Sequence, residues 1–310
     1  MKDKKKIFVN LFVALMILLV FAQTFYGVHK KSVTWDELCY IGAGKYILKT
    51  GNFGYNALVY HPPLSFYINS MFIYFLKFDD DIYKKDECFG IGNRMIFHSQ
   101  YNPKIIVLLT RLPIILLSVV LAFLVWKWAS ALYGVKSGLF ALILYTFNTT
   151  ILSYAGLALT DFVAAFFIFC TLFAFWIYAN NRSVIKIIAI GACLGLALLS
   201  KATSLILVPA LLIATYANKR HQGLSSKPAI MDLIVIFFLA ILIIFAGYGF
   251  RFGTLGNALD EHYRERANEE INKLPEIVSN SLNFMFSRIP LPFPNYFTEI
   301  GSVNYYSKTG

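Results

Sequence analysis

The sequence predicts an all-α polytopic membrane protein, and the composition, the apolar runs and the placement of charge all favour that class. Hydrophobic residues make up 58% of the 310 residues and charged residues 15%, and the mean hydropathy is +0.61. Soluble domains are about 45–50% apolar and about 25% charged. A chain this apolar could not hide its surface from water, which excludes a soluble domain, a disordered chain, a coiled coil and a small disulfide scaffold.

Seven apolar runs are candidates for membrane spans, each of which needs roughly 20 mostly apolar residues. The first run follows a lysine-rich start and lacks a small-residue cleavage site, so we expect an uncleaved anchor rather than a signal peptide. The predicted spans are 7–28, 105–128, 138–155, 162–179, 184–200, 203–217 and 230–250. The fifth and sixth are short, and their hairpin is not expected to cross fully. We expect one membrane domain over 1–310.

Basic residues stand mainly at the ends of these runs, within a net charge of +11. This pattern is typical of orientation signals and differs from a nucleic-acid-binding patch, so no nucleic-acid partner is expected. Because Lys and Arg favour the cytoplasmic side, we expect a cytoplasmic N-terminus, with 29–104 and 251–310 outside. The plasma membrane is the expected location.

The long outer segment is predicted to contain two helices. Residues 36–49 can form a helix with an apolar side, and 64–78 form an apolar stretch after two prolines. At about 15 residues, the second is too short to span and is expected to lie in the membrane interface. Elsewhere, Gly191 and Gly195 form a small-xxx-small pair, which predicts close helix packing.

Asp36 and Glu37 are the first candidate functional residues, directly after the first span. Neighbouring positions cannot share one helix face. One carboxylate can therefore point into a cavity while the other caps the helix. The alternative is an acidic helix start that only complements the helix dipole.

His61 and Asp161 are further candidates with simple structural alternatives. His61 precedes Pro62 and Pro63, which fix a rigid extended entry to the following helix; it could equally be a loop histidine without a role. Asp161 lies between the third and fourth predicted spans, where Thr160 or Asp161 could cap the fourth helix.

Lys201 and Arg111 are cations at or within predicted spans. Charges inside the membrane usually mark function, although Lys201 could snorkel to the outer surface. Arg111 lies about 9 Å inside the second span at 1.5 Å per residue. Asp36 or an anionic lipid headgroup is the expected partner of Arg111.

The predicted topology places all of these residues at the outer boundary of the membrane. The acids are Asp36, Glu37 and Asp161, and the basic residues are His61, Arg111, Lys201 and Arg251. A carboxylate base, together with cations for a phosphate leaving group, is what glycosyl transfer from a lipid phosphate requires. Cys39 and Cys88 also fall outside, where a disulfide could persist, but the sequence cannot establish their distance.

Several short motifs follow one another along residues 30–210. They are Trp35-Asp36-Glu37, Tyr46-Ile47-Leu48-Lys49-Thr50-Gly51-Asn52-Phe53, His61-Pro62-Pro63-Leu64, Arg111-Leu112-Pro113, Leu132-Tyr133-Gly134, Leu159-Thr160-Asp161 and 195–201. In this order they resemble the polyprenyl-phosphate-sugar-dependent glycosyltransferases. This group includes the protein O-mannosyltransferases and the lipid A aminoarabinose transferase, and has the GT-C membrane fold.

The resemblance implies an inverting transferase that moves a sugar from a polyprenyl phosphate to a hydroxyl-bearing acceptor on the extracytoplasmic face. It implies that Asp36 is the catalytic base, supported by Glu37, and that Asp161 is a second cavity acid. Lys201 and Arg111 would hold the donor phosphate, and His61 would shape the pocket; Arg251 is a further candidate cation. No cofactor is required by the sequence, although Asp36 and Asp161 could bind a divalent cation through oxygen.

Members of this group are usually longer, so the chain is expected to be an N-terminal portion. Two alternatives to an active transferase stay open. One is a transporter or flippase of a lipid-linked sugar, which would favour charges near the bilayer midplane and broken helices in paired halves. The other is a truncated, non-catalytic relic of the transferase.

Overall fold

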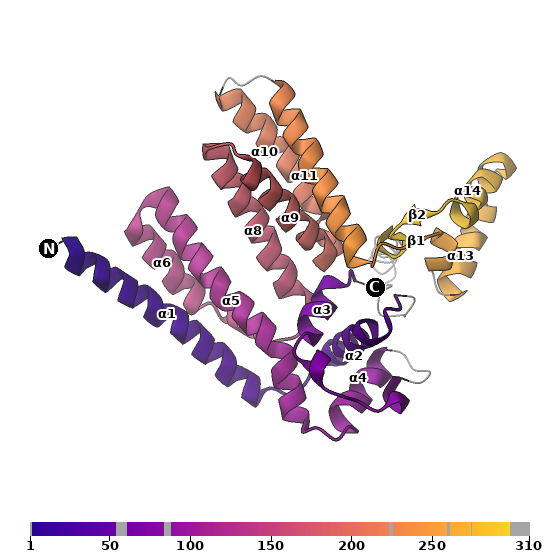
Figure 1. The fold of residues 1–310 in the computed structure, drawn as a ribbon, viewed down its shortest axis with the longest axis horizontal. Coiled ribbons are helices and arrows are strands. Elements are labelled where there is room, and N and C mark those ends of the chain that lie inside the picture. Colours follow the sequence, from indigo (N-terminus) through magenta and orange to yellow (C-terminus); the bar gives the residue numbers. More distant parts are fainter. Residues whose placement is uncertain are drawn as a thin grey trace. The chain divides into compact units, whose positions relative to one another are not determined.

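The computed structural model describes residues 2–53, 61–83, 88–222, 226–258, 261–273 and 275–297. Helices dominate these residues (Figure 1). The short strands β1 (Phe252–Gly253) and β2 (Leu291–Pro292) pair antiparallel, with Phe252 opposite Pro292. The prediction of an all-α membrane fold is confirmed.

The chain divides into two compact units. The first contains Met1–Lys45 and Phe66–Phe169, and the second contains Tyr46–Ser65 and Cys170–Gly310. The assignment of 1–310 to one membrane domain stays a prediction.

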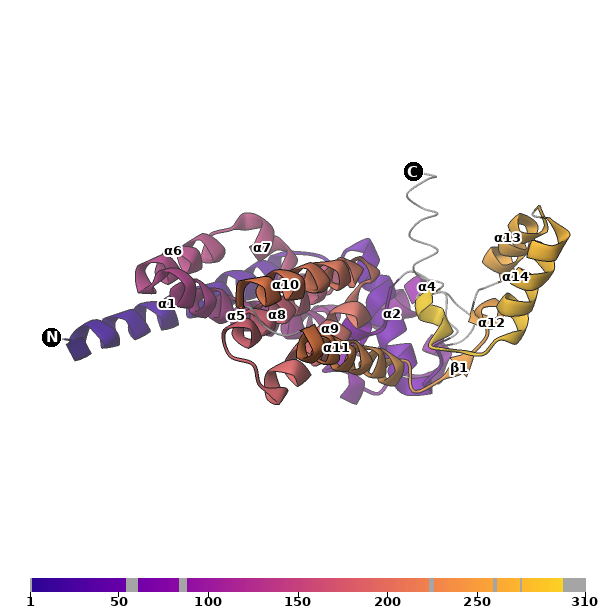
Figure 2. The same cartoon turned by 90° about the horizontal axis from the view of Figure 1, so that it is seen from above.

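The helices up to residue 154 begin and end as follows. They are α1 (Lys2–Lys30), α2 (Trp35–Thr50), α3 (Leu64–Ser70), the 3₁₀ turns η2 (Ile73–Phe75) and η3 (Asp80–Tyr83), α4 (Cys88–Phe97), α5 (Pro103–Tyr133), α6 (Val135–Thr146) and α7 (Thr149–Tyr154). In both views α5 and α6 run side by side in the first unit (Figures 1 and 2).

The helices from residue 160 complete the fold. They are α8 (Thr160–Asn180), α9 (Val184–Ser200), the 3₁₀ turn η4 (Ala202–Ile206), α10 (Leu207–Gln222), α11 (Ser226–Gly247), α12 (Leu255–Ala258), α13 (Glu261–Asn272) and α14 (Glu276–Arg288). Figure 2 shows α13 and α14 packed together in the segment predicted to lie outside. The last part of that segment, 298–310, lies outside the described residues.

Four helices in the described part of the chain are long and apolar enough to cross a membrane. They comprise Lys4–Lys30, Pro103–Tyr133, Thr160–Asn180 and Ile230–Gly247. Three shorter apolar helices occupy Val135–Thr146, Val184–Ser200 and Ala202–Asn218. All seven predicted runs therefore contain an apolar helix, although three are shorter than a full span.

The third predicted span, 138–155, was wrong in its extent. Helix α6 ends at Thr146, and α7 starts a new helix at Thr149. The break follows from Asn148, whose side chain accepts a hydrogen bond from the Ile151 N–H and so caps α7. An Asn side chain favours such a helix start over a helix interior.

The predicted interfacial helix over 64–78 is also interrupted. Helix α3 ends at Ser70, and the chain becomes extended at Leu76. Buried Lys45 donates hydrogen bonds from Nζ to three carbonyl oxygens of the following turn, those of Ile73, Tyr74 and Leu76, at 2.7–3.1 Å. These carbonyls are satisfied by an ammonium group instead of by a continuing helix.

Within the second unit, the small-xxx-small prediction is confirmed. A side chain on Gly191 would approach the Leu239 side chain at 2.9 Å, and one on Gly195 would approach Ile243 at 2.8 Å. Both contacts belong to α11, which lies beside α9 in both views (Figures 1 and 2). The absence of side chains at these two positions allows the helices to pack closely.

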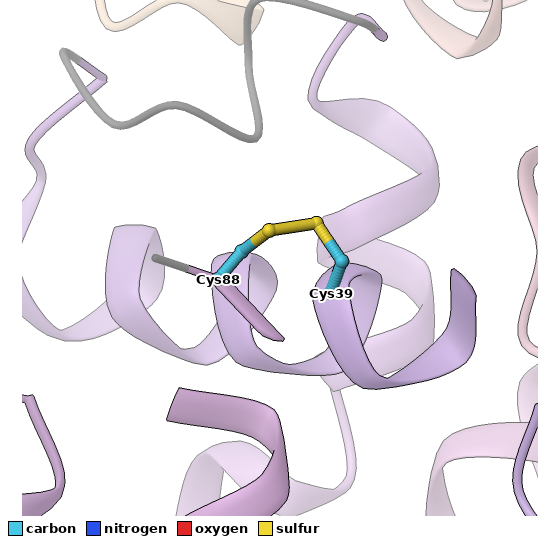
Figure 3. Close-up of a disulfide and its surroundings, with 2 residues drawn as sticks. All are labelled: Cys39 and Cys88. Carbon is cyan, nitrogen blue, oxygen red and sulfur yellow. A yellow bond between two sulfur atoms is a disulfide. The ribbon is translucent and has the colours of Figure 1, made fainter. Parts of the chain in front are cut away.

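Cys39 and Cys88 form the disulfide that the sequence left open (Figure 3). It joins α2 to the first residue of α4, with the two Cα atoms 4.5 Å apart. The helices also meet closely at Gly42 and Gly92, where an added Cβ would collide with backbone atoms of the opposite helix. The disulfide thus links α4 to α2 within one helical turn of Asp36 and Glu37.

Candidate active site

The two neighbouring carboxylates at the start of α2 lie in different surroundings. Asp36 is exposed, whereas the Glu37 side chain is fully buried. Consecutive residues on a helix point in different directions, so one helical turn presents one acid to the exterior and the other to the protein. Only Asp36 is therefore accessible to a substrate from this pair.

Glu37 is held by contacts to both of its oxygens. Arg111 donates from Nε to Oε1 at 2.7 Å and from Nη2 to Oε2 at 2.6 Å. The Ala158 N–H donates to Oε1, and the Thr34 N–H and hydroxyl donate to Oε2. Burial by itself would raise the pKa of Glu37, but the hydrogen bonds and charge of Arg111 and the two N–H groups hold that pKa below its ordinary value.

Arg111 has a different partner from the one we expected. The expected partners were Asp36 or a lipid headgroup, whereas Arg111 binds Glu37 and is fully buried. Its remaining N–H groups donate to the carbonyl oxygens of Val28, Lys31 and Ser32 at 2.8–3.4 Å. The reason is depth, because α5 begins at Pro103, which places Arg111 about 12 Å along the helix. At that depth a charge needs a buried counter-charge.

Asp161 lies in the first turn of α8, which begins at Thr160. It therefore complements the helix dipole from within the helix instead of capping it. Asp161 is exposed and contributes to the lining of a largely apolar cavity of about 430 Å³. Residues of α5, α6, α7 and α8 line this cavity, and they include Leu121 and Phe169 as well as the hydroxyl-bearing Tyr145 and Thr150.

Tyr40 is a further residue of this site, influenced by the charges of both exposed acids, and the sequence analysis did not identify it. Burial, followed by the negative charges of Asp36 and Asp161, raises the pKa of Tyr40 far above its ordinary value, and a hydrogen bond with Thr160 opposes this shift. Both carboxylates therefore lie within electrostatic reach of one phenol. The sequence did contain a signal for Tyr40: it follows Asp36 by four residues, and residues with this spacing lie on the same face of a helix.

The second unit holds the other candidate residues. Lys201 ends α9 in an extended conformation, at a partly exposed position before η4, so it does not lie in mid-helix. Ser65, four residues after His61, donates to the Ser200 carbonyl and joins the His61 segment to the chain beside Lys201. Arg251 is exposed, and its guanidinium lies 5.1 Å from the Phe53 ring centre.

The structure thus groups the candidates within each unit. Asp36, Glu37, Asp161 and Arg111 belong to the first unit, and His61, Lys201 and Arg251 belong to the second. No group of three or more His, Cys, Asp or Glu residues suited to a metal ion occurs among the described residues. A divalent cation at Asp36 and Asp161 stays a hypothesis.

Comparisons with known proteins agree with this architecture. Residues 108–246 match the sequence model of a family described as dolichyl-phosphate-mannose-protein mannosyltransferase. Among solved structures, the chain is similar to a protein O-mannosyltransferase from S. cerevisiae, solved as the Pmt1-Pmt2 complex bound to the sugar donor. The identity is 18% and the TM-score 0.56, over 77% of this chain and 32% of that one. No curated protein sequence matches.

This chain therefore spans about a third of the length of the solved protein. At that identity the likeness establishes the fold, and the match over 108–246 begins before Arg111 and passes through Asp161 and Lys201. The chain is an integral membrane protein with a GT-C-type fold, and its predicted resemblance to the protein O-mannosyltransferase group of membrane glycosyltransferases is confirmed.

Proposed function

We propose that the chain is part of a membrane glycosyltransferase that moves a sugar from a polyprenyl-phosphate donor to a hydroxyl-bearing acceptor on the extracytoplasmic face. The observation that carries the proposal is the division of labour between Asp36 and Glu37. Asp36 is exposed on a helix start that Glu37 and Arg111 anchor. A general base requires this combination of access and fixed position.

In the proposed reaction, Asp36 accepts the proton of the acceptor hydroxyl. The acceptor oxygen then bonds to the anomeric carbon while the bond from that carbon to the phosphate oxygen breaks, with inversion. The electron pair leaves with the polyprenyl phosphate. The description of the matching family names dolichyl-phosphate mannose as the donor. For the present chain, a mannose on a dolichol-like carrier is the proposed donor.

The other candidates receive supporting roles in this proposal. Glu37 and Arg111 position the start of α2, since both are buried and fully engaged with each other and with backbone groups. This assignment replaces a donor-binding role for Arg111. Lys201 and Arg251 are the cations proposed for the donor phosphate. His61 is proposed to shape the same pocket, as the resemblance implies. Asp161 supplies the second acid, at the edge of a largely apolar cavity.

The test is transfer from a radiolabelled polyprenyl-phosphate mannose, in vesicles that contain equal amounts of each variant. Asp36→Asn keeps the side-chain shape and removes proton acceptance, so the rate should fall about 10²–10⁴-fold. Asp79→Asn is the matched control, because Asp79 is an exposed acid of the same outer segment, and it should retain the activity.

Wild-type activity in Asp36→Asn would rule out Asp36 as the base. Movement of the labelled lipid between leaflets without transfer to any acceptor, and unaffected by Asp36→Asn, would favour the flippase alternative. The thermal stability of Asp36→Asn should fall by less than about 1 kcal/mol, since the exposed side chain contributes only through the dipole of α2.

A further inference from the structure

None of the candidate catalytic or donor-binding residues is in the lining of a second cavity in the first unit. It has a volume of about 340 Å³ and is formed where α1 ends, α4 ends and α5 begins. In Figure 1 these three helix ends meet in the same part of the unit. Its lining includes His29, Lys30, Lys31 and Lys104 together with apolar side chains such as Ile96 and Phe97.

The lining of this cavity is basic. Lys30, Lys31 and Lys104 are exposed lysines that contribute to it: Lys30 ends α1, Lys31 follows it, and Lys104 lies in the first turn of α5. The Lys30 ammonium lies over the Tyr26 ring, 5.6 Å from its centre. His29 also lines the cavity. None of its lining residues is acidic. Three lysines in the lining of one cavity, with no acidic residue in that lining, favour an anionic ligand.

The floor of the cavity is apolar. Val28, Ile96 and Val107 are buried beneath it, and Phe97 is 52% exposed at its edge. Helices α1 and α5 are both long and apolar enough to span the membrane, and the cavity lies at one end of each. A basic rim above an apolar floor at a membrane boundary matches the two parts of a phospholipid, its phosphate and its upper acyl chains.

The wall that carries two of these lysines is fixed before any ligand binds. Arg111 donates hydrogen bonds to the carbonyl oxygens of Val28, Lys31 and Ser32, and its other contacts are to buried Glu37. The backbone around Lys30 and Lys31 is therefore held from below. A preformed wall reduces the ordering cost of binding.

The orientation rule does not explain these lysines. In the predicted topology this end of α1 and α5 faces outward, whereas Lys and Arg near span ends are favoured on the cytoplasmic side. Three lysines at this position oppose the signal of the lysine-rich N-terminus. Binding of a ligand provides a reason for their presence that orientation does not.

We propose that this cavity binds the headgroup of an anionic membrane phospholipid. Lys30, Lys31 and Lys104 contact the phosphate, and the apolar floor with Phe97 receives the first carbons of the acyl chains. The occupant is a bulk membrane lipid and not the sugar donor, because neither Asp36 nor Asp161 lines the cavity. The lipid would join the end of α1 to the start of α5.

The experiment measures lipid binding to the detergent-solubilised full chain by native mass spectrometry. The probes are phosphatidylglycerol, phosphatidylcholine and, separately, inorganic phosphate. The wild type should retain phosphatidylglycerol in preference to phosphatidylcholine. The triple variant Lys30→Gln/Lys31→Gln/Lys104→Gln should bind phosphatidylglycerol about 100-fold more weakly, at about fivefold for each lysine near a lipid surface.

A second triple variant, Lys77→Gln/Lys127→Gln/Lys136→Gln, is the matched control. It removes the same charge from three exposed lysines that do not line the cavity, and it should bind phosphatidylglycerol as the wild type does. Lys30→Arg/Lys31→Arg/Lys104→Arg keeps the charge and should retain most of the binding. Each variant is first checked for folding by its helical circular dichroism and elution volume.

Three results would overturn the proposal. Equal losses in the cavity variant and the control would show a general charge effect. Equal retention of phosphatidylcholine and phosphatidylglycerol by the wild type would show no headgroup selection. Suppression of phosphatidylglycerol binding by an equal concentration of inorganic phosphate would show a site for a free anion.

Discussion

Each unit of the molecule contains an acid–arginine pair, and the two pairs differ in their surroundings rather than in their contact distance. In the first unit, Arg111 and Glu37 meet at 2.6 Å, and both side chains are 0% exposed. In the second unit, Arg182 and Asp232 also meet at 2.6 Å, but the Arg182 side chain is 54% exposed. Contact distance alone therefore does not indicate how much the fold depends on a pair.

The two pairs also organise different amounts of structure. Arg111 binds the Val28 carbonyl near the end of α1. Glu37 accepts from the Thr34 N–H just before α2 and from the Ala158 N–H two residues before α8. Arg182 lies in the turn between α8 and α9, and Asp232, which also accepts from the Tyr178 hydroxyl, attaches that turn to α11. When one charge of a fully buried pair is removed, the other charge stays buried, with neither a partner nor water to stabilise it. When an exposed charge is removed, water can solvate the side of its partner that it covered.

The largest expected effect is that of Arg111→Met. Removing one member of a buried pair costs about 3–5 kcal/mol, because the other charge is left buried and unpaired. The variant should show a much lower unfolding temperature in detergent, or a strongly reduced yield of folded protein. The double variant Glu37→Gln/Arg111→Met should recover part of the loss, since no charge stays unpaired. Wild-type stability of Arg111→Met would show that the pair does not anchor α2.

Acid should weaken the first unit through the same pair. Because the pKa of Glu37 in the folded chain lies below its ordinary value of 4.5, the pair contributes fully above about pH 4.5. This contribution is lost as the pH falls through the lower pKa of the folded state. The unfolding temperature of the wild type should therefore fall more steeply below pH 4.5 than that of Glu37→Gln. Parallel curves for the two proteins would contradict the assignment.

The smallest effect is expected in the second unit, from Tyr178→Phe. This change removes one hydrogen bond to Asp232, at 2.7 Å, while Arg182 keeps its contacts with both carboxylate oxygens. The cost should be about 1.5–3 kcal/mol, because the acceptor is a carboxylate, and the decrease in unfolding temperature should be smaller than that of Arg111→Met. Tyr216→Phe, at a tyrosine of α10 that is 65% exposed, is the control and should change nothing. A loss as large as that of Arg111→Met would remove the contrast between the pairs.

Composition and short motifs determined the class of the protein and the identity of its candidate residues. The apolar runs predicted the seven apolar helices found among the described residues, because a segment that enters a bilayer must satisfy its backbone within one helix. The residues of the motif around Asp36 are adjacent in the chain. The motif could therefore be recognised from the sequence alone, and it indicated the transferase group. The small-residue spacing of Gly191 and Gly195 likewise predicted a packed helix face.

The tertiary structure decided which of these residues are accessible and which are anchors. The partner of Arg111 is 74 residues away in sequence, and local spacing gives no preference between Asp36 and Glu37. Which of the two is buried depends on the direction in which α2 starts and on the buried N–H of Ala158, which binds Glu37. The surroundings of Tyr40 and Lys45 likewise include distant groups, the Asp161 carboxylate on α8 for Tyr40 and the Ile73 carbonyl for Lys45. Such choices depend on burial and on distant contacts, because the cost of an unpaired buried charge exists only once the fold excludes water.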